Sequence, residues 1–153
     1  ITSATGDNLN IFRIAGPNQI AATELIAASY YMSASGTYST TAPINFDTKE
    51  YDSHGSLVTT GASWKFAPPA AGLYSFGGSI DLTSGASVIL YKNGSAYKRV
   101  GYDIGSTDAS YYGTVRLAVG DYFDIRPSGS VTVNGSGTLA ASPTNINIIR
   151  VGL

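Results

Sequence analysis

Residues 87–104 have the sequence SVILYKNGSAYKRVGYDI. Ser87 to Lys92 is a short apolar run that suits a strand, and Ala96 to Ile104 supplies the return strand. Between them stands Asn93-Gly94, the strongest short-range hairpin signal, because a type I′ turn needs a positive φ at both central positions. The stretch therefore predicts an antiparallel hairpin.

Alternation of apolar and polar residues continues on both sides of this hairpin and indicates further strands. Gly120-Asp121 predicts a turn, and Pro127 ends a strand because proline cannot donate to a ladder. Roughly ten strands at short, regular spacing are typical of an antiparallel sandwich or barrel, so we expect an all-β fold. The other expected strands cover residues 42–49, 56–60, 62–66, 73–82, 111–119, 122–126, 130–133 and 145–153, and the expected loops cover residues 83–86, 105–110 and 134–142.

The first 25 residues differ slightly from the rest. We interpret residues 1–25 as an N-terminal arm or the end of a preceding stalk, and residues 26–153 as one domain. Residue 1 is Ile rather than Met, which indicates a cleaved chain or the tail of a longer protein. Residues 19–28, rich in Ala and Leu, are compatible with a short helix. They lead directly into residues 29–32, which favour a strand, so both interpretations stay open.

Charge is scarce along the chain. Charged residues make up 12% of the 153 residues and the formal net charge is -1, against roughly 25% charged residues in an ordinary globular domain. Without a net positive field, counterion release cannot drive nucleic-acid binding. The lack of Cys excludes disulfides and thiolate metal sites. No apolar stretch approaches the roughly 20 residues that span a bilayer, so we expect neither a nucleic-acid partner nor membrane insertion.

The single histidine, His54, is the first candidate for chemistry. It could be the base of a Ser-His-Asp triad, but no G-x-S-x-G elbow marks a nucleophilic serine. It cannot form a zinc site without further His or Cys ligands. An exposed histidine in a turn explains it better.

Paired carboxylates could hydrolyse a glycosidic bond, and the sequence offers two groups of them. Asp47, Glu50 and Asp52 surround an expected strand end, where capping or solvation accounts for them, and Asp121 and Asp124 lie in and after a turn. A calcium site built from Asp47, Asp52 and loop carbonyls is a minor alternative. We therefore expect no enzyme, such as a polysaccharide depolymerase, and no cofactor.

Short motifs follow a recognisable order along the chain. Their positions are Ile44 to Asp47 with Tyr51 and His54-Gly55, Thr60-Gly61, Phe66 and Pro69 ahead of Gly72-x-Tyr74-x-Phe76, Leu90-x-x-Asn93-Gly94, Val115 to Phe123, and an apolar C-terminal strand ending at Leu153. Over roughly residues 26–153 this order resembles that of C1q/TNF-like jelly-roll domains.

The resemblance implies a ten-strand antiparallel jelly-roll sandwich that assembles as a homotrimer about a three-fold axis. The family's closing F-S-G-F motif is Ile149-Arg150-Val151-Gly152 here, and no acidic cluster suits the calcium that some members bind. Richness in Ser, Thr, Gly and Ala with few charges is more similar to the bacterial and bacteriophage members. Few charges also favour subunit contacts, since charged residues are depleted at interface cores.

The resemblance leads us to expect a non-enzymatic, trimeric structural or adhesion module of a virion: a phage fibre tip, a capsid appendage or a decoration protein. A receptor-binding tip would bind host surface glycans, whereas a fibre-building protein would attach to other virion or fibre proteins through residues 1–25. The alternatives are the head domain of a bacterial surface fibre and a secreted carbohydrate-binding module. All of them imply a virion or extracellular surface location.

Tyrosine suits both subunit interfaces and sugar-binding surfaces, because it is amphipathic and has little side-chain entropy. Tyr74 and Phe76, with Phe66 and Trp64 nearby, are also the expected core of the sandwich. The expected ligand-binding loops carry Tyr102, Asp108, Tyr112 and Asn134. The expected trimer-interface residues are Tyr74, Phe76, Tyr111, Val115, Leu117, Ile148 and Val151.

Overall fold

Antiparallel strands make up almost all of the regular structure in the computed structural model, which describes residues 24–58, 63–103, 108–138 and 143–153. The first sheet has the order β3 (Thr48–Asp52), β1 (Ala27–Tyr31), β12 (Asn145–Gly152), β6 (Gly72–Asp81) and β9 (Asp108–Leu117). The second sheet has the order β4 (Leu57–Val58), β5 (Lys65–Phe66), β10 (Phe123–Pro127), β7 (Ala86–Lys92) and β8 (Ser95–Asp103). A separate ribbon pairs β2 (Gly36–Tyr38) with β11 (Val131–Val133).

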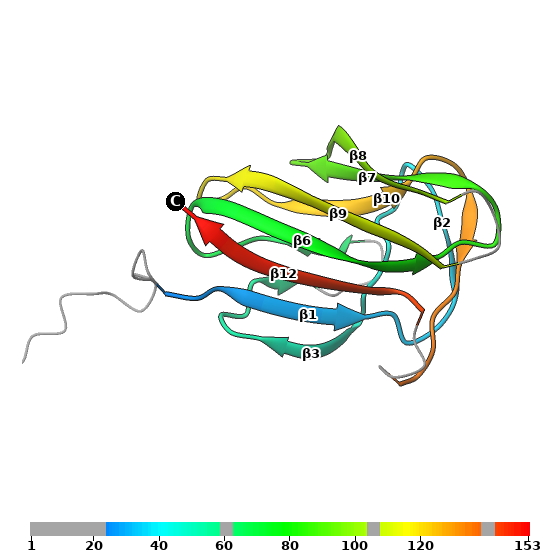
Figure 1. Ribbon diagram of the computed structural model, residues 1–153, viewed down its shortest axis with the longest axis horizontal. Coiled ribbons are helices and arrows are strands. Elements are labelled where there is room, and N and C mark those ends of the chain that lie inside the picture. Colours follow the sequence, from blue (N-terminus) through cyan, green and yellow to red (C-terminus); the bar gives the residue numbers. More distant parts are fainter. Residues whose placement is uncertain (1–23, 59–62, 104–107, 139–142) are drawn as a thin grey trace, which may run out of the picture.

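The two five-stranded sheets face each other as a sandwich, and Figure 1 looks onto the first sheet with the second behind it. Strands that are distant in the sequence become neighbours: β12 pairs with both β1 and β6. The described N-terminal part and the C-terminus lie at the same end of the sandwich (Figure 1), where the backbone N–H of Arg150 donates to the carbonyl oxygen of Ile26.

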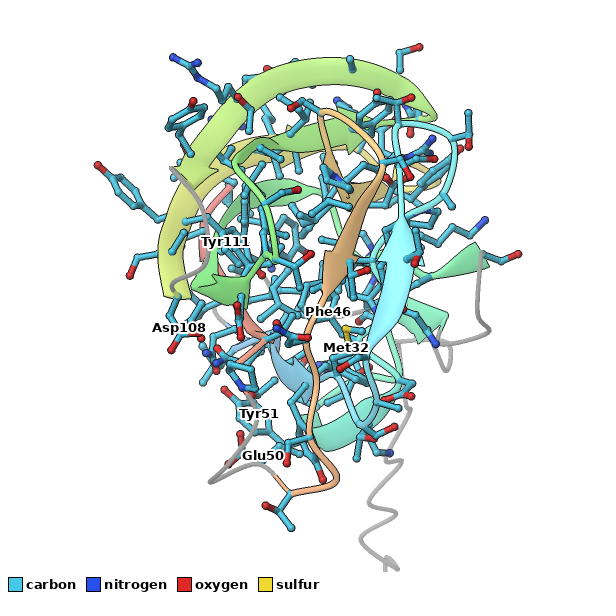
Figure 2. The ribbon with its side chains drawn as sticks, turned by 90° about the vertical axis from the view of Figure 1, so that its right-hand side faces the viewer. Met32, Phe46, Glu50, Tyr51, Asp108 and Tyr111 are labelled. Atoms are coloured by element: carbon cyan, nitrogen blue, oxygen red, sulfur yellow. The ribbon has the colours of Figure 1, made fainter. Side chains whose placement is uncertain are left out.

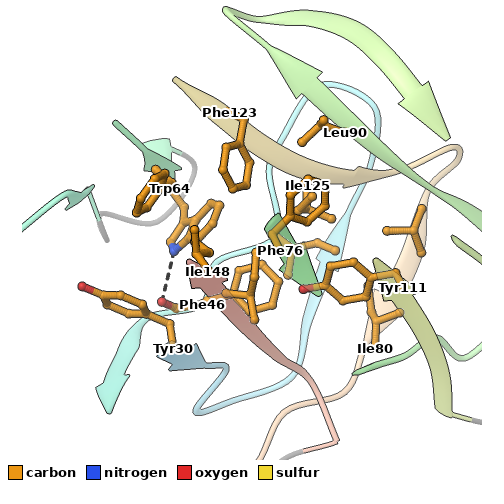
Figure 3. Packing of buried hydrophobic residues seen from close by; sticks show 14 of the residues in the cluster. Tyr30, Phe46, Trp64, Phe76, Ile80, Leu90, Tyr111, Phe123, Ile125 and Ile148 are labelled. Carbon is orange, nitrogen blue, oxygen red and sulfur yellow. Dashed lines mark hydrogen bonds between the residues drawn. The ribbon is translucent and has the colours of Figure 1, made fainter. Parts of the chain in front are cut away.

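The core fills the space between the sheets because alternate residues of each strand point inward. In β6 the inward residues Tyr74, Phe76 and Ile80 are at most 2% exposed, which confirms the expected core. Aromatic rings connect the two layers, with Phe76 and Phe123 5.0 Å apart between centroids. Figure 3 shows this packing, with the indole N–H of Trp64 donating to the carbonyl oxygen of Phe46.

The hairpin predicted from residues 87–104 is confirmed between β7 and β8. Asn93 has a φ of 51° and Gly94 a φ of 80°, as a type I′ turn requires. Gly120 at the predicted second turn has a φ of 92°. The strands expected over residues 73–82, 111–119, 122–126 and 145–153 agree with β6, β9, β10 and β12 within a few residues.

The strand expected over residues 42–49 is wrong for most of its length, because β3 begins only at Thr48. Pro43 has no backbone N–H to donate to a ladder. The backbone N–H of Ile44 donates to the carbonyl oxygen of Ile125, and the carbonyl oxygen of Phe46 accepts from Trp64. Single contacts to the second sheet therefore replace a strand ladder along this segment.

Three smaller differences concern the segments around the sandwich. The helix considered over residues 19–28 does not form in its described part, because Ala27 and Ala28 belong to β1. Residues 108–110, expected in a loop, begin β9. β1 and β2, which precede all ten expected strands, raise the strand number from ten to twelve. The expected arm, residues 1–25, lies almost wholly outside the described residues, so the division at residue 26 stays a prediction.

Across the described ranges, no helix is long and apolar enough to cross a membrane.

Candidate interaction surface

The outer face of the first sheet carries two adjacent rows made up of uncharged residues, and the carboxylate of Glu50 reaches the first row at Ser29. The register aligns Tyr51, Ser29, Asn147, Gly77 and Tyr112 in one row, and Ala27, Ile149, Ser75 and Thr114 in the next. We call these nine residues the uncharged face. Three of its large side chains are open to solvent: Tyr51 is 47% exposed, Ile149 41% and Tyr112 80%. Exposed aromatic and aliphatic groups without charge are typical of protein–protein interfaces.

The expected trimer-interface residues lie mostly on the other face of the same strands. Tyr74, Phe76, Tyr111, Val115, Leu117 and Ile148 are at most 2% exposed and belong to the core. Their side chains cannot reach a neighbouring subunit, so this part of the prediction is wrong. Val151, the seventh, is exposed. Since a shift of one residue moves a side chain to the opposite face of a sheet, the outer positions fall on neighbours such as Tyr112 and Ile149.

The expected ligand-binding residues lie mainly on strands rather than in loops. Tyr102 is on β8, and Asp108 and Tyr112 are on β9. Asn134 is in a loop, where its side-chain amide donates to the carboxylate of Asp81 at 3.0 Å. Asp108 lies opposite Asp81 in the pairing of β6 with β9, so Asp108 and Asn134 both neighbour Asp81. Figure 2 shows Asp108 and Tyr51 at the surface and Tyr111 inside.

A groove runs along the edge of the sandwich where β8 of the second sheet lies next to β9 of the first. Lys98 spans this edge and donates from Nζ to the carbonyl oxygen of Thr114. Tyr112 belongs to the groove and to the uncharged face, so the two surfaces adjoin along β9. The groove has a volume of about 400 Å³ and is lined by Lys98, Arg99, Val100, Tyr112, Gly113 and Thr114.

His54 stands in a short chain of hydrogen bonds. Its Nδ1 lies 2.7 Å from Ser53 Oγ, and its Nε2 lies 3.0 Å from Glu24 Oε1. The Ser53 hydroxyl oxygen also accepts from the backbone N–H of Ala27 at 3.0 Å. These contacts fasten the turn after β3 to the beginning of β1, which is a structural task.

The carboxylates in β3 and directly before it each accept a hydrogen bond from the protein. Asp47 accepts from the backbone N–H of Ser33 at 2.8 Å, and Glu50 accepts from the Ser29 hydroxyl at 2.7 Å. Asp52 accepts from the buried Tyr30 hydroxyl at 2.9 Å; burial, followed by this contact, raises the pKa of Tyr30.

The candidate calcium site is not formed. Asp47 directly precedes β3 and Asp52 is its last residue, and a strand rises about 3.3 Å per residue. The two carboxylates are therefore too far apart to share one ion. Within the described part of the chain, no cluster of three or more His, Cys, Asp or Glu side chains suits a metal ion.

A second concave region lies on the outer face of the second sheet. It has a volume of about 220 Å³ and includes Lys65, Tyr122, Asp124 and Arg126 among its lining residues. The sequence pattern indicated Asp124 only as one of a pair of carboxylates, and it indicated no role for Lys65 or Arg126. The signal was available, because Asp124 and Arg126 are two residues apart in an alternating strand and must share a face. We call this region the outer pocket.

Comparison with solved structures identifies the fold of the chain. No protein-family model matches the chain, and no curated protein matches its sequence. Among solved structures, the globular domain of zebrafish complement 1qA protein has a TM-score of 0.58 and 14% identity, over 83% of this chain and 96% of that chain. Eiger TNF from S. frugiperda has a TM-score of 0.58 and 16% identity, over 84% and 93%. The PRD1 vertex protein P5 has a TM-score of 0.51 and 14% identity, over 86% and 99%.

The chain therefore folds as an all-β, antiparallel jelly-roll sandwich. More particularly, its fold is similar to the jelly-roll fold of C1q and TNF domains, in agreement with the resemblance in the order of its sequence motifs. The same architecture also occurs in a phage vertex protein.

Proposed function

We propose that the chain is a non-enzymatic structural and adhesion module that assembles as a homotrimer on a virion surface. The observation that carries this proposal is the uncharged face, which crosses the whole first sheet and exposes Tyr51, Ile149 and Tyr112. Burying such a face against another subunit removes apolar area from water. Burying a charged face would instead cost the hydration free energy of its charged groups.

A closed three-fold ring needs a heterologous contact, in which one surface of a protomer meets a different surface of the next. The β8 side of the groove, with Lys98 and Arg99, differs from the uncharged face, whereas the β9 side shares Tyr112 and Thr114 with it. In the proposed trimer, one protomer places its β8 edge at the margin of its neighbour's uncharged face. A stable interface buries about 1,600 Å² in total, so the proposed contact has to extend well beyond the three exposed side chains of the uncharged face.

The virion location is supported by the shared fold with the PRD1 vertex protein P5. The chemistry of the surface agrees with it, because a chain with only 12% charged residues suits a role in assembly and adhesion. We expect mass spectrometry of purified virions to detect the chain. Its absence from the virions would contradict the proposed location.

The trimer is tested with Ile149→Asp. Light scattering of the wild-type chain should give three times the protomer mass of 15.9 kDa. Ile149→Asp should give the mass of one protomer, because it would bury an unpaired carboxylate in the contact.

The matched control is Val119→Asp. Val119 is also exposed, at 72%, but it precedes the turn Gly120 and is not part of the uncharged face, so this variant should remain trimeric. A wild-type monomer at micromolar concentration would refute the proposed assembly. An Ile149→Asp variant that stays trimeric would refute the assignment of the face.

A further inference from the structure

The outer pocket lies on the side of the sandwich opposite the uncharged face. Its floor comes from β5 and β10 of the second sheet, and one wall comes from the segment that precedes β3. A trimer that buries the first sheet would leave this pocket facing outward. The pocket is lined by Thr41, Pro43, Ser63, Trp64, Lys65, Tyr122, Asp124 and Arg126.

A buried ion pair makes part of the pocket rigid. The guanidinium of Arg126 donates from Nε to Asp124 Oδ1 at 2.6 Å and from Nη2 to Asp124 Oδ2 at 2.9 Å. Its Nη1 donates to the carbonyl oxygen of Thr40 at 3.0 Å, and its Cζ lies 4.2 Å from the centre of the Tyr91 ring. Asp124 is only 2% exposed. A bidentate pair in which each guanidinium nitrogen donates one hydrogen bond is a preorganised surface for a ligand.

Lys65 is the positively charged group of the pocket that is not neutralised by a carboxylate of the described residues. Its Nζ lies 4.6 Å from the centre of the Tyr122 ring. Among the residues that the structure describes, it donates no hydrogen bond and has no ion-pair partner. The lining carries two positive groups, Lys65 and Arg126, and one negative group, Asp124, so the pocket has one net positive charge. Its unpaired cation is complementary to one carboxylate.

The other lining groups suit a polyhydroxylated ring. Thr41 and Ser63 contribute hydroxyl groups that can donate and accept, and Tyr122 contributes an amphipathic ring. The volume of about 220 Å³ is below the roughly 300 Å³ at which pockets for drug-sized ligands begin. One sugar ring fits this scale better than a longer chain.

We propose that the outer pocket binds a single acidic sugar residue, a hexuronic acid, with its carboxylate on Lys65 and its hydroxyl groups on Thr41 and Ser63. This inference deepens the adhesion role proposed above and rests on it, because it names the class of surface glycan that the module would recognise.

The test measures binding directly by isothermal titration calorimetry. Titration of the full chain with D-glucuronate should give a saturable heat of binding, with a Kd of about 1 mM for a ligand of this size. D-glucose, which lacks the carboxylate, should bind at least about tenfold more weakly.

The decisive variant is Lys65→Met, which keeps the apolar stem and removes the charge. It should weaken D-glucuronate binding to the level of D-glucose. Lys49→Met, on β3 of the other sheet, is the matched control and should bind as wild type does. Equal affinity for the two sugars, an unchanged affinity in Lys65→Met, or no response at all would overturn the inference. Displacement of D-glucuronate by acetate at equal concentration would also overturn it, since the site would then recognise a carboxylate alone.

Light scattering of the same samples separates this inference from the proposed assembly. A monomer that binds D-glucuronate would refute the trimer and leave the pocket intact. A trimer that fails to bind it would refute the pocket and leave the assembly intact.

Discussion

Asp121 shows how a turn signal in the sequence becomes an electrostatic property of the folded chain. Its carboxylate accepts from the backbone N–H of Ala118 at 2.9 Å and from the Asn93 side chain at 2.7 Å, and it lies 2.9 Å from Lys92 Nζ. The backbone contact with Ala118, followed by the contacts with Asn93 and Lys92, lowers the pKa of Asp121 to about 2. Each contact favours the ionised form.

This lowered pKa predicts a specific dependence on acid. Because the pKa in the folded chain is below that in the unfolded chain, ionised Asp121 stabilises the fold above about pH 4, and this contribution is lost as the pH falls toward 2. Asp121→Asn has no such contribution to lose. Circular dichroism at about pH 7, 4 and 2 should show a lower melting temperature for the variant at pH 7 and a smaller gap between the two proteins at pH 2.

The control for this experiment is Asp108→Asn, which removes an exposed carboxylate from the opposite end of β9. Its melting temperature should fall between pH 4 and pH 2 as that of the wild type does. Parallel curves for wild type and Asp121→Asn through this range would contradict the assigned role of Asp121.

At the scale of elements, the tip of the β7–β8 hairpin is connected to the turn between β9 and β10. Asn93 donates through its side-chain amide to Asp121, and its Oδ1 accepts from the backbone N–H of Tyr122 at 3.0 Å. Its own backbone N–H donates to the carbonyl oxygen of Tyr122 at 3.1 Å. The Asn-Gly turn therefore has two tasks: it reverses the chain and it joins two hairpins.

Two substitutions at Asn93 separate these tasks. Asn93→Gly keeps the positive φ but loses the side-chain contacts, which should lower the free energy of unfolding by about 1 kcal/mol. Asn93→Ala loses the same contacts and also strains the left-handed backbone, which adds about 1 kcal/mol. Urea denaturation measures both. If Asn93→Ala proves as stable as Asn93→Gly, the turn does not depend on the positive φ.

Elements were predictable where the signal is local. The Asn93-Gly94 turn and the alternating runs around it predicted β6 to β10, because turn chemistry and period-two burial act within a few residues. Six of the expected interface residues fell on the core face of their strands, one position away from exposed ones, as Tyr111 and Tyr112 show. Both are aromatic, so the local pattern did not reveal which one faces the core. The tertiary structure determines which of them is buried. The Tyr111 hydroxyl donates to the carbonyl oxygen of Asn145, which lies on β12, a strand remote from β9 in the sequence.

The outer pocket was missed for a similar reason. Lys65 and Arg126 are far apart in the sequence and meet only because β5 and β10 pair within the second sheet. Nothing local indicates that Lys65 lacks a carboxylate partner, since this depends on the tertiary arrangement. The Asp124–Arg126 pair alone could have been inferred, from its spacing of two within a strand.

At the scale of the whole molecule, the two candidate surfaces divide the sandwich between them. The uncharged face lies on the first sheet and the outer pocket on the second, so assembly and ligand binding can occur together without competition. Three pockets would then face away from the three-fold axis. Three simultaneous weak contacts give a multivalent attachment much stronger than a single contact of about millimolar strength.

The same assembly predicts that thermal stability depends on concentration. If unfolding is coupled to dissociation of a trimer, each tenfold increase in concentration stabilises a protomer by about 0.9 kcal/mol, two-thirds of RT ln 10. For a domain of this size that corresponds to a rise of about 2–4 °C in melting temperature. Differential scanning calorimetry over about a hundredfold range of concentration should show this rise for the wild type and for Val119→Asp. Ile149→Asp should melt at one temperature throughout, because a monomer has no mass-action term. A wild-type melting temperature that does not change with concentration would mean that the uncharged face contributes nothing to stability through subunit contact.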